Sequence, residues 1–458
     1  MTDTDSLDRL GQAAPTERDE APAGVRGVAA QDARAAIIGL GYVGLPLGLS
    51  LLDAGLDVVG VDANAARLEA LAAGRSPIDD VSDGRLGDAL RRGFRLRSTA
   101  DPGLEDVDAM FVCVPTPVTP AKDPDLTAVL NAAALVARSL RPGQLVILQS
   151  TTYPGTTSGP FRAQLEQSGL VAGRDFGLAY APERVNPGDP QSLQATLPKL
   201  VGGLTVADTQ RAARLLRRIG GQVVELSSPD AAEMAKLLEN VFRNVNIALV
   251  NQLALLCERM GLDVWEVIDA AATKPFGFMP FRPGPGVGGH CIPVDPYYLS
   301  WRARQFGLTD RFVELAGDIN ARMPHHVADL VAQALNERSL PVRGARVGVI
   351  GVAFKSNVRD ARNSPAAEVL AELARRGARL AYHDPHVPAF RDAAGAEYES
   401  VPLPEVLATD VVLVLVRHRD IDWPRVYEGA SLVVDTVNSS TEQAVRPRQV
   451  LRLGAGWS

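Results

Sequence analysis

Cysteine is scarce in this chain of 458 residues, which contains only three. Cys113, Cys257 and Cys291 are far apart, odd in number and form no Cys-x-x-Cys pair. This spacing argues against a disulfide framework and against a zinc site. We therefore expect no bound metal and a reducing compartment, the cytoplasm.

Positive charge and long apolar runs are also lacking. The formal net charge is −7 and the basic residues are scattered, so attraction to nucleic acid or to an anionic membrane is not expected. No apolar run reaches the roughly 18 residues of a membrane span, and residues 1–33 contain no apolar core of a signal peptide. We expect residues 1–33 to form a disordered tail.

Length and composition favour several globular domains. The chain is 46% hydrophobic and 22% charged, and 458 residues are too many for one ordinary core. Apolar strand-like runs alternate with helical patterns, which predicts parallel sheets with helices on both faces. The expected fold class is α/β, with two Rossmann-like doubly wound domains joined by a long central helix.

A dinucleotide motif lies in the first domain. The strand that begins at Arg34 runs into Gly39, Gly41 and Gly44, which form G-x-G-x-x-G, and Asp62 ends the next strand 18 residues after Gly44. A pyrophosphate could approach these glycines at a helix N-terminus, and Asp62 could bind the ribose hydroxyls. Because a carboxylate repels a 2′-phosphate, NAD is predicted rather than NADP. The alternative is that Asp62 is a solvated strand end.

A long helix is predicted to bridge the two domains. Ser228 is a suitable N-cap, Pro229 suits the first helical position, and the pattern continues to Met260 before Gly261. One face of this helix carries Lys236, Asn240, Asn244, Ile247 and Asn251. Such polar groups are costly to bury without polar partners. The face is therefore either solvated or part of a polar site, and its many apolar neighbours argue against solvation.

The loop from Pro283 to Pro296 places one thiol among four glycines. Backbone N–H groups could approach Cys291 closely there and lower the pKa of its thiol, and Asp295 follows four residues later. This pattern suits covalent catalysis. The alternative is a tight connection with Cys291 as an inert buried group.

Other residues are expected to have structural roles. Cys113 and Cys257 lie in apolar runs and are predicted to be core residues. His290 adjoins Cys291, but adjacent side chains usually point apart, so we expect no catalytic role for it. Surface positions are expected for His325, His326, His383 and His386. The section from Gly344 lacks the full glycine fingerprint, so NAD is not expected there.

Three long motifs make the order of parts recognisable. They are Ser150-Thr-Thr-Tyr-Pro-Gly-Thr-Thr157, Ala232-Glu-Met-Ala-Lys-Leu-Leu-Glu-Asn240, and Lys274-Pro-Phe-Gly-Phe278 through Gly-Gly-His-Cys-Ile-Pro-Val-Asp-Pro296. Over about residues 35–436 the chain resembles the UDP-glucose/GDP-mannose dehydrogenase family, and within it the bacterial UDP-N-acetylglucosamine 6-dehydrogenases. The domains expected are an NAD-binding Rossmann domain at 34–226, a central helical and dimerisation domain with the cysteine loop at 227–330, and a UDP-sugar-binding Rossmann-like domain at 331–458.

The resemblance implies a reaction. The sugar C6 alcohol would be oxidised to a carboxylate with two NAD+, for surface polysaccharide synthesis. Cys291 would hold the aldehyde as a thiohemiacetal and then as a thioester, which water hydrolyses. Lys236 would stabilise the oxyanion and Asn240 would orient the same oxygen. The water would be held by Thr152 and Asp295, while Glu183 would take part in acid–base steps; which of Glu183, Asp295 and Lys236 takes each proton stays open.

Binding residues are implied as well. For NAD they are Gly39, Gly41, Tyr42, Val43, Gly44, Asp62, Arg67, Val114, Thr116, Thr152 and, from the third domain, Arg362. For the UDP-sugar they are Glu183, Arg184, Lys236, Asn240, Arg282, Gly288, Phe354 and Lys355. Arg282 or Lys274 would reach the substrate of a neighbouring subunit, so a homodimer or higher homo-oligomer with the long helix as interface is expected.

Some features leave the substrate open. Arg359 replaces the first member of an expected acid pair, and Val437 stands where the family usually has an arginine. UDP-glucose, UDP-N-acetylmannosamine and UDP-N-acetylgalactosamine remain alternative substrates. A catalytically silent nucleotide-sugar sensor would be expected to have lost Cys291, Lys236 or Asp295, and a one-step dehydrogenase would not need Cys291.

Overall fold

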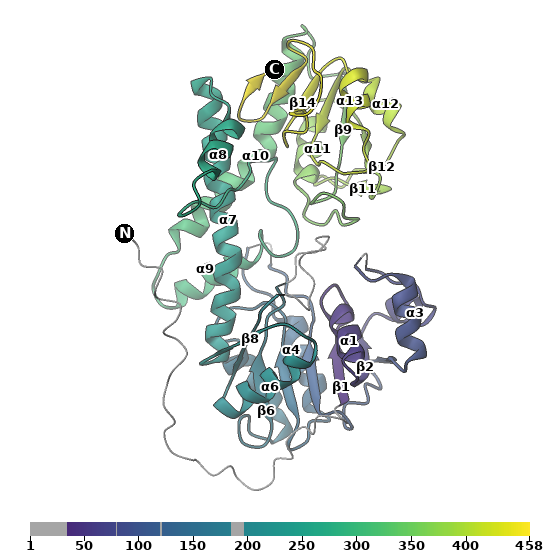
Figure 1. Cartoon of the computed structure of the whole chain (residues 1–458), viewed down its shortest axis with the longest axis vertical. Coiled ribbons are helices and arrows are strands. Elements are labelled where there is room, and N and C mark those ends of the chain that lie inside the picture. Colours follow the sequence, from purple (N-terminus) through teal and green to yellow (C-terminus); the bar gives the residue numbers. More distant parts are fainter. Residues whose placement is uncertain (1–33, 79, 120, 185–196) are drawn as a thin grey trace.

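The computed structural model describes residues 34–78, 80–119, 121–184 and 197–458 (Figure 1). The predicted tail at residues 1–33 lies outside these ranges. Among the described residues, no helix is both long and apolar enough to cross a membrane.

The first part of the chain forms an eight-stranded sheet with the order β3-β2-β1-β4-β5-β6-β7-β8. The strands are β1 (Arg34–Ile38), β2 (Asp57–Asp62), β3 (Arg95–Ser98), β4 (Ala109–Val112), β5 (Leu145–Leu148), β6 (Gly177–Tyr180), β7 (Lys199–Gly203) and β8 (Val223–Leu226). The strand order reverses at β1 and β4, and ligands of such sheets bind beyond the carboxyl ends of the strands at this point.

Helices cover both faces of this sheet. They are α1 (Gly44–Asp53), α2 (Ala65–Ala72), α3 (Asp83–Arg91), α4 (Thr127–Ala137), α5 (Arg162–Leu165) and α6 (Val206–Arg218). Helices α1 and α6 share one apolar core with the sheet, whereas α4 and α5 belong to a second core with alternate strand residues. Two separate cores around one sheet are what a doubly wound fold requires, which confirms the predicted architecture.

The last part of the chain forms a second sheet with the order β10-β9-β13-β14-β15-β16. Its strands are β9 (Arg346–Ile350), β10 (Arg379–His383), β13 (Val411–Val414), β14 (Val433–Asp435), β15 (Val450–Arg452) and β16 (Gly456–Trp457), with helices α11 (Pro365–Arg375), α12 (Leu403–Leu407) and α13 (Trp423–Gly429). A small ribbon of β11 (Ala389–Arg391) and β12 (Glu397–Glu399) lies beside it.

Both sheets depart from the purely parallel arrangement that was expected. Strands β6 and β7 pair antiparallel, and so do β15 and β16. The connection between β15 and β16 is a three-residue turn with Gly454 at φ +73°. Such a turn is too short for the crossover that parallel strands need.

Helix α7 (Pro229–Met260) connects the two sheets, as Figure 1 shows. The side chain of Ser228 accepts a hydrogen bond from the N–H of Ala231, and the helix ends at Gly261 with φ 69°. These are the predicted start and stop signals, and 32 residues span about 48 Å. Around α7 lie α8 (Val264–Ala272), α9 (Asp295–Gln305) and α10 (Arg311–Asn336).

The core prediction for Cys113 and Cys257 is confirmed, since both are buried. The surface prediction for the histidines is confirmed only for His325, which is exposed although it lies inside α10. His326 is mostly covered and lies 3.0 Å from a carboxylate oxygen of Glu258. His383 and His386 are partly buried because residues 400–420 pack against the end of β10.

Candidate active site

A cavity of about 2010 Å³ opens where the two sheets and α7 meet. Its walls come from the glycine loop after β1, the ends of β2, β4 and β5, the polar face of α7, the Cys291 loop and the loop after β9. Ordinary small-molecule sites occupy roughly 300–1,000 Å³. This cavity is therefore large enough for two ligands side by side.

The glycine loop is shaped for a phosphate group. Gly39 has φ +96°, and a Cβ there would lie 2.6 Å from the carbonyl oxygen of Cys113. Gly41 borders open space, so a ligand can approach its backbone. A Cβ on Gly44 would lie 1.9 Å from the carbonyl oxygen of Gly39, so Gly44 supports the turn rather than lining the cavity. No side chain caps the first turn of α1, whose N–H groups can therefore serve an anion.

Asp62 is fixed beside this loop and is only 5% exposed. Its Oδ2 accepts hydrogen bonds from the N–H of Leu40 (2.8 Å) and from Arg67 Nη1 (2.9 Å), and its Oδ1 accepts one from the N–H of Asn64 (2.8 Å). The alternative interpretation as a solvated strand end is wrong. An anchored carboxylate at the end of β2 is positioned for ribose hydroxyls.

The structure brings most of the predicted NAD residues to this cavity. Gly39, Gly41, Tyr42, Val43, Asp62, Arg67, Val114, Thr116 and Arg362 all line it. Thr152 does not, because its side chain is fully buried and its Oγ1 donates to Glu233 Oε1 (3.2 Å). The preceding residue, Thr151, lines the cavity instead. The motif identified the segment, but the order of two adjacent threonines gave no signal about which one turns inward.

Glu233 is a buried site residue that the sequence reasoning missed. Its carboxylate accepts hydrogen bonds from the N–H groups of Gly155 (2.7 Å) and Thr157 (2.9 Å) and from the hydroxyl of Thr157 (2.6 Å). Burial raises the pKa of this carboxyl to about 7, against the effect of these donors. Because Glu233 lies on α7, one turn before Lys236, it ties the Thr151 segment to the helix that carries Lys236. The sequence signal for this role was the position of Glu233 inside the motif that also contains Lys236.

Cys291 faces the cavity from the Gly-rich loop. The predicted lowering of its thiol pKa is not found: the pKa is raised to about 11, chiefly by the surrounding protein and then by the charge of Asp295. Lys236 and Arg243 oppose this rise only in part. The carbonyl of Cys291 accepts the N–H of Asp295 (2.8 Å), which joins the loop to the start of α9. The thiol therefore needs a base before it can act as a nucleophile.

Asp295 is the nearby buried carboxylate, and burial raises its pKa to about 7. The charge of Lys236 and a hydrogen bond from Asn240 Nδ2 to Asp295 Oδ2 (2.5 Å) oppose the rise. Lys236 and Asp295 line the cavity with Cys291, whereas Asn240 lies behind Asp295. A thiol, a cation and a carboxylate that titrates near neutrality thus meet at one place.

The polar face of α7 is buried, so the alternative of a solvated face is wrong. Asn251 donates to Asn320 Oδ1 (2.9 Å), and Asn320 Nδ2 donates to Asn244 Oδ1 (2.9 Å). Asn251 Oδ1 also accepts the N–H of Gly284 (3.0 Å) at the start of the Cys291 loop. These hydrogen bonds between amides offset the free-energy cost of burying the polar face. They also anchor the Cys291 loop to α7.

His290 joins the two halves of the cavity. Its Nε2 lies 3.2 Å from Asp360 Oδ2, and its ring lies between Tyr42 and Phe354. Asp360 also pairs with Arg362, whose guanidinium lies 5.1 Å from the centre of the Tyr42 ring. Burial and then the charge of Arg362 lower the pKa of His290. The third part of the chain therefore contacts the NAD loop directly.

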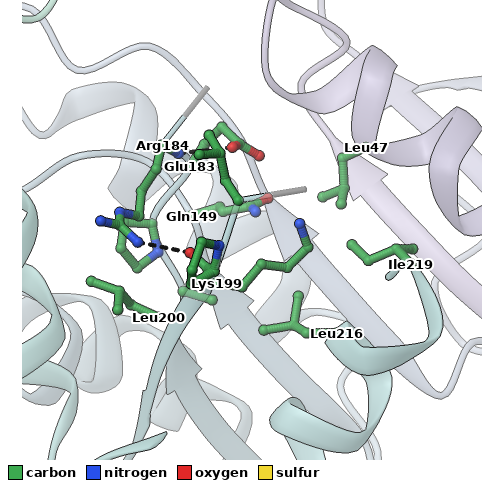
Figure 2. A pocket seen from close by; sticks show the side chains of 12 residues that line it. Leu47, Gln149, Glu183, Arg184, Lys199, Leu200, Leu216 and Ile219 are labelled. Carbon is green, nitrogen blue, oxygen red and sulfur yellow. Dashed lines mark hydrogen bonds between the residues drawn. The ribbon is translucent and has the colours of Figure 1, made fainter. Parts of the chain in front are cut away.

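Glu183 lines the main cavity, but Arg184 does not. Arg184 Nη1 donates to the carbonyl of Pro198 (2.7 Å), and its Nη2 pairs with Oε1 of Glu239 in α7 (2.5 Å). Figure 2 shows Arg184 and Lys199 on the walls of a second pocket, which shares Gln149 and Glu183 with the main cavity. Its volume is about 10 Å³. That space holds about one water. Arg184 thus braces α7, and its contact with a nucleotide sugar stays a prediction.

The remaining substrate residues lie at different depths. Phe354 lines the cavity, and Gly288 is packed behind it, since a Cβ there would lie 2.9 Å from Asn363 O and 3.0 Å from Phe354 Cβ. Lys355 is partly exposed next to Phe354. Arg282 lies outside the cavity and pairs with Asp269 of α8.

Comparison with known proteins shows which family shares this arrangement of domains. Family models for the UDP-glucose/GDP-mannose dehydrogenase family match the chain in three pieces: the NAD binding domain at residues 33–219, the central domain at 230–322 and the UDP binding domain at 348–442. The chain belongs to this family. It is an NAD-dependent nucleotide-sugar dehydrogenase, and the expectations of an oxidoreductase with NAD as cofactor are confirmed.

Individual relatives act on several amino sugars. The chain is 37% identical to the UDP-N-acetyl-D-glucosamine 6-dehydrogenase of Pseudomonas aeruginosa, over 85% of this chain and 92% of that protein. It is 34% identical to the NDP-N-acetyl-D-galactosaminuronic acid dehydrogenase of Ralstonia solanacearum, over 87% and 94%. The UDP-D-ManNAc dehydrogenase structure from Pyrococcus horikoshii superposes with a TM-score of 0.83 at 31% identity and covers 92% of this chain and 99% of that one.

The NAD-binding region of this dehydrogenase fits the cofactor on structural grounds. The uncapped start of α1 and the open backbone at Gly41 would hold the pyrophosphate, and Asp62 would hold the adenosine ribose. Within the described residues, no group of three or more His, Cys, Asp or Glu could hold a metal ion.

Proposed function

We propose that this dehydrogenase oxidises the C6 alcohol of a UDP-N-acetylhexosamine to the carboxylate, with UDP-N-acetylglucosamine as substrate. The observation that carries the proposal is the meeting of Cys291, Lys236 and Asp295 in a cavity whose walls also include the NAD loop and the loop after β9. The choice of sugar rests on the Pseudomonas aeruginosa relative. UDP-N-acetylmannosamine, UDP-N-acetylgalactosamine and UDP-glucose are the alternatives for the same chemistry.

In the first oxidation the C6 hydroxyl loses a proton and a hydride and becomes an aldehyde. NAD+ supplies the hydride acceptor for this step and for the second oxidation. The ammonium of Lys236 stabilises the negative charge that develops on the C6 oxygen, because a cation in a water-poor site interacts strongly with such charge. Asp295, with its pKa near 7, is suited to accept the hydroxyl proton at neutral pH.

In the second oxidation the thiol of Cys291 adds to the aldehyde. Asp295, which releases each proton it has accepted to solvent before the next step, takes the thiol proton, sulfur bonds to C6, and the C6 oxygen takes a proton from Lys236, which gives a thiohemiacetal. The hydroxyl proton then returns to Lys236 while a second hydride leaves C6, which leaves a thioester. A base is required here because the raised pKa of the thiol leaves few thiolates at neutral pH.

Hydrolysis releases the product and restores the enzyme. A water molecule held between Asp295 and Thr151 attacks the thioester carbon while Asp295 accepts its proton. The C–S bond breaks, the sulfur takes the proton from Asp295 and the uronic acid leaves. Thr151 takes the role assigned to Thr152 from the sequence because it lines the cavity. Glu183, which also lines the cavity, is proposed as a second acid–base group.

The UDP moiety is proposed to bind between Phe354, Lys355 and the Gly288 segment. Phe354 offers a ring against which a base can stack, and Lys355 can donate to phosphate oxygens. This assignment agrees with the match of the family's UDP binding domain to residues 348–442. The product is proposed to feed surface polysaccharide synthesis in the cytoplasm, where NAD and UDP-sugars are made.

A second copy of the chain is proposed to cover the outer face of α7. This face exposes an apolar stripe at helical spacing, made of Leu238, Phe242, Leu249, Leu253, Leu256 and Met260. Such a stripe on a 32-residue helix is too long and too apolar to remain in water. Arg282 is partly exposed where it pairs with Asp269 of α8, and it is proposed to reach the partner's substrate from there.

The experiment measures NADH formed per UDP-N-acetylglucosamine consumed, with UDP-glucose in parallel. We expect two NADH per sugar for the wild type, and for Cys291→Ser a loss on the order of 100-fold or more in turnover, because the variant lacks the nucleophile that carries the second oxidation. Cys257→Ser is the matched control, because Cys257 is buried in α7 against Val264 and Trp265. One NADH per sugar, or an unaffected Cys291→Ser enzyme, would refute the thioester route.

A further inference from the structure

The loop that follows β9 contains a residue in a strained conformation. Phe354 and Asn357 of this loop line the cavity. Asn357 has φ +61°, in the left-handed region that residues other than glycine seldom adopt. Such a conformation persists only where the surroundings hold it in place.

Two hydrogen bonds to the segment after β13 fix Asn357. Its backbone N–H donates to Nδ1 of His418 (3.0 Å), and its Oδ1 accepts the N–H of Arg419 (2.8 Å). His418 is fully buried. Because its Nδ1 accepts a hydrogen bond, the ring proton lies on Nε2, which donates to Asp384 Oδ2 (3.1 Å).

Asp384 holds the other end of the same loop. Its Oδ2 accepts the N–H groups of Val352 (2.8 Å) and Ala353 (3.1 Å), directly after β9. Its Oδ1 accepts the N–H of His386 (2.8 Å). Burial opposes the charge on Asp384, but His418 and the backbone donors hold the pKa of its carboxyl below the ordinary value. Hydrogen bonds thus fix residues 352–357 at both ends, to Asp384 at the start and to His418 at the end.

We infer that Asp384 and His418 are positioning residues that hold the 352–357 loop in the shape that binds the UDP end of the substrate. This inference rests on the proposed function, in which Phe354 and Lys355 contact the nucleotide. Neither residue lines the cavity, so each acts only through the loop backbone. Asp384 follows β10 and His418 follows β13, and these two strands lie on either side of β9.

A matched pair of substitutions at His418 tests the inference in the full-length protein. The amide of His418→Asn can place an oxygen near the position of Nδ1 and keep the bond from Asn357. The amide of His418→Gln can place an NH₂ near the position of Nε2 and keep the bond to Asp384 while losing the bond from Asn357. Calorimetric titration with UDP should show about tenfold weaker binding for His418→Gln and a smaller loss for His418→Asn.

Asn357 gives an independent test that does not disturb the buried pair. Asn357→Gly tolerates positive φ, so it should retain UDP binding better than Asn357→Ala, which must adopt a strained backbone. His383→Gln is the control, because His383 contacts the carbonyl of Val401 and not the loop. NAD binding, titrated separately, should change less than twofold in all folded variants, whereas a merely structural defect would weaken both ligands.

The possible outcomes distinguish failure of the positioning role from failure of the proposed function. Equal UDP affinity in the wild type, His418→Gln and Asn357→Ala would overturn the positioning role and leave the proposed function intact. A parallel loss of NAD and UDP binding would also overturn it. If UDP did not bind to the wild type, the proposed function would fail, and this inference with it.

Discussion

Replacing Asp295 by asparagine should make the protein more stable than the wild type, and the difference in stability should grow as the pH rises. The carboxyl of Asp295 is buried, and its pKa is about 7 in the folded protein compared with 3.8 as the ordinary value. A carboxyl whose pKa is raised on folding favours the folded state while it is protonated. That stabilisation is present below the unfolded pKa and is lost as the pH rises through the folded pKa. Asparagine resembles the protonated form and does not titrate.

The magnitude follows from the shift of about three pKa units. Each unit corresponds to about 1.4 kcal/mol, so ionisation costs the folded wild type about 4 kcal/mol in total. With these two pKa values, the wild type has already lost about 1.5 kcal/mol of its free energy of unfolding at pH 5. It loses roughly 3 kcal/mol more by pH 8.5. Lys236 is included in this sum, because its charge already acts on the folded pKa of Asp295.

The assay compares Tm for wild type and Asp295→Asn at several values between pH 5 and pH 8.5. For a chain of this size the Tm advantage of the variant should grow by roughly 3–5 °C over that range. Glu233, whose pKa is also raised to about 7, titrates in both proteins and cancels in the difference. Asp318→Asn is the control, because Asp318 is exposed on α10 and its variant should track the wild type.

A pH-independent difference between the two proteins would refute the reasoning, because it would mean that Asp295 titrates alike in the folded and unfolded states. The same variant should form NADH at least 100-fold more slowly at pH 8, since it cannot accept a proton. Stabilisation together with lost turnover would show that the buried carboxylate is kept for chemistry at a cost in stability.

Two further predictions concern the cofactor and the assembly. Asp62→Ser should raise kcat/KM with NADP relative to NAD by at least tenfold, because the anchored carboxylate no longer repels a 2′-phosphate; steady-state kinetics with both cofactors measure this ratio, and an unchanged ratio would mean that Asp62 does not face the ribose. The double variant Leu249→Glu and Leu253→Glu should run as a monomer of 48.7 kDa in light scattering, against twice that mass for the wild type and for the control Val206→Glu on α6; a wild type that is itself monomeric would disprove the proposed dimer.

The sequence was most informative where a signal is local. Gly39, Gly41 and Asp62 were found because a strand, a tight turn and a helix start follow each other within one short stretch. The limits of α7 were found in the same way, since capping by Ser228 and the left-handed stop at Gly261 depend on neighbouring residues alone. The segment that contains Cys291 and Asp295 was identified by its composition.

Tertiary packing decided how these segments meet. Adjacent threonines at 151 and 152 face different surroundings, and only the fold shows that Thr152 turns to Glu233. Arg184 braces α7, and His290 reaches Asp360 from another part of the chain. None of these pairings has a sequence period, because the partners lie between 55 and 81 residues apart.

The acidity of the site shows the same division. The sequence determined that a thiol, a lysine and a carboxylate are available, and backbone N–H groups near Cys291 suggested a lowered pKa. The structure instead buries Asp295 and places Cys291 in a cavity walled by protein and beside the charge of Asp295, which raises both pKa values. Charge in a protein is stabilised or destabilised by everything packed within several ångströms of it. Residue identity is therefore written in the sequence, whereas the pKa of a buried group is a property of the assembled fold.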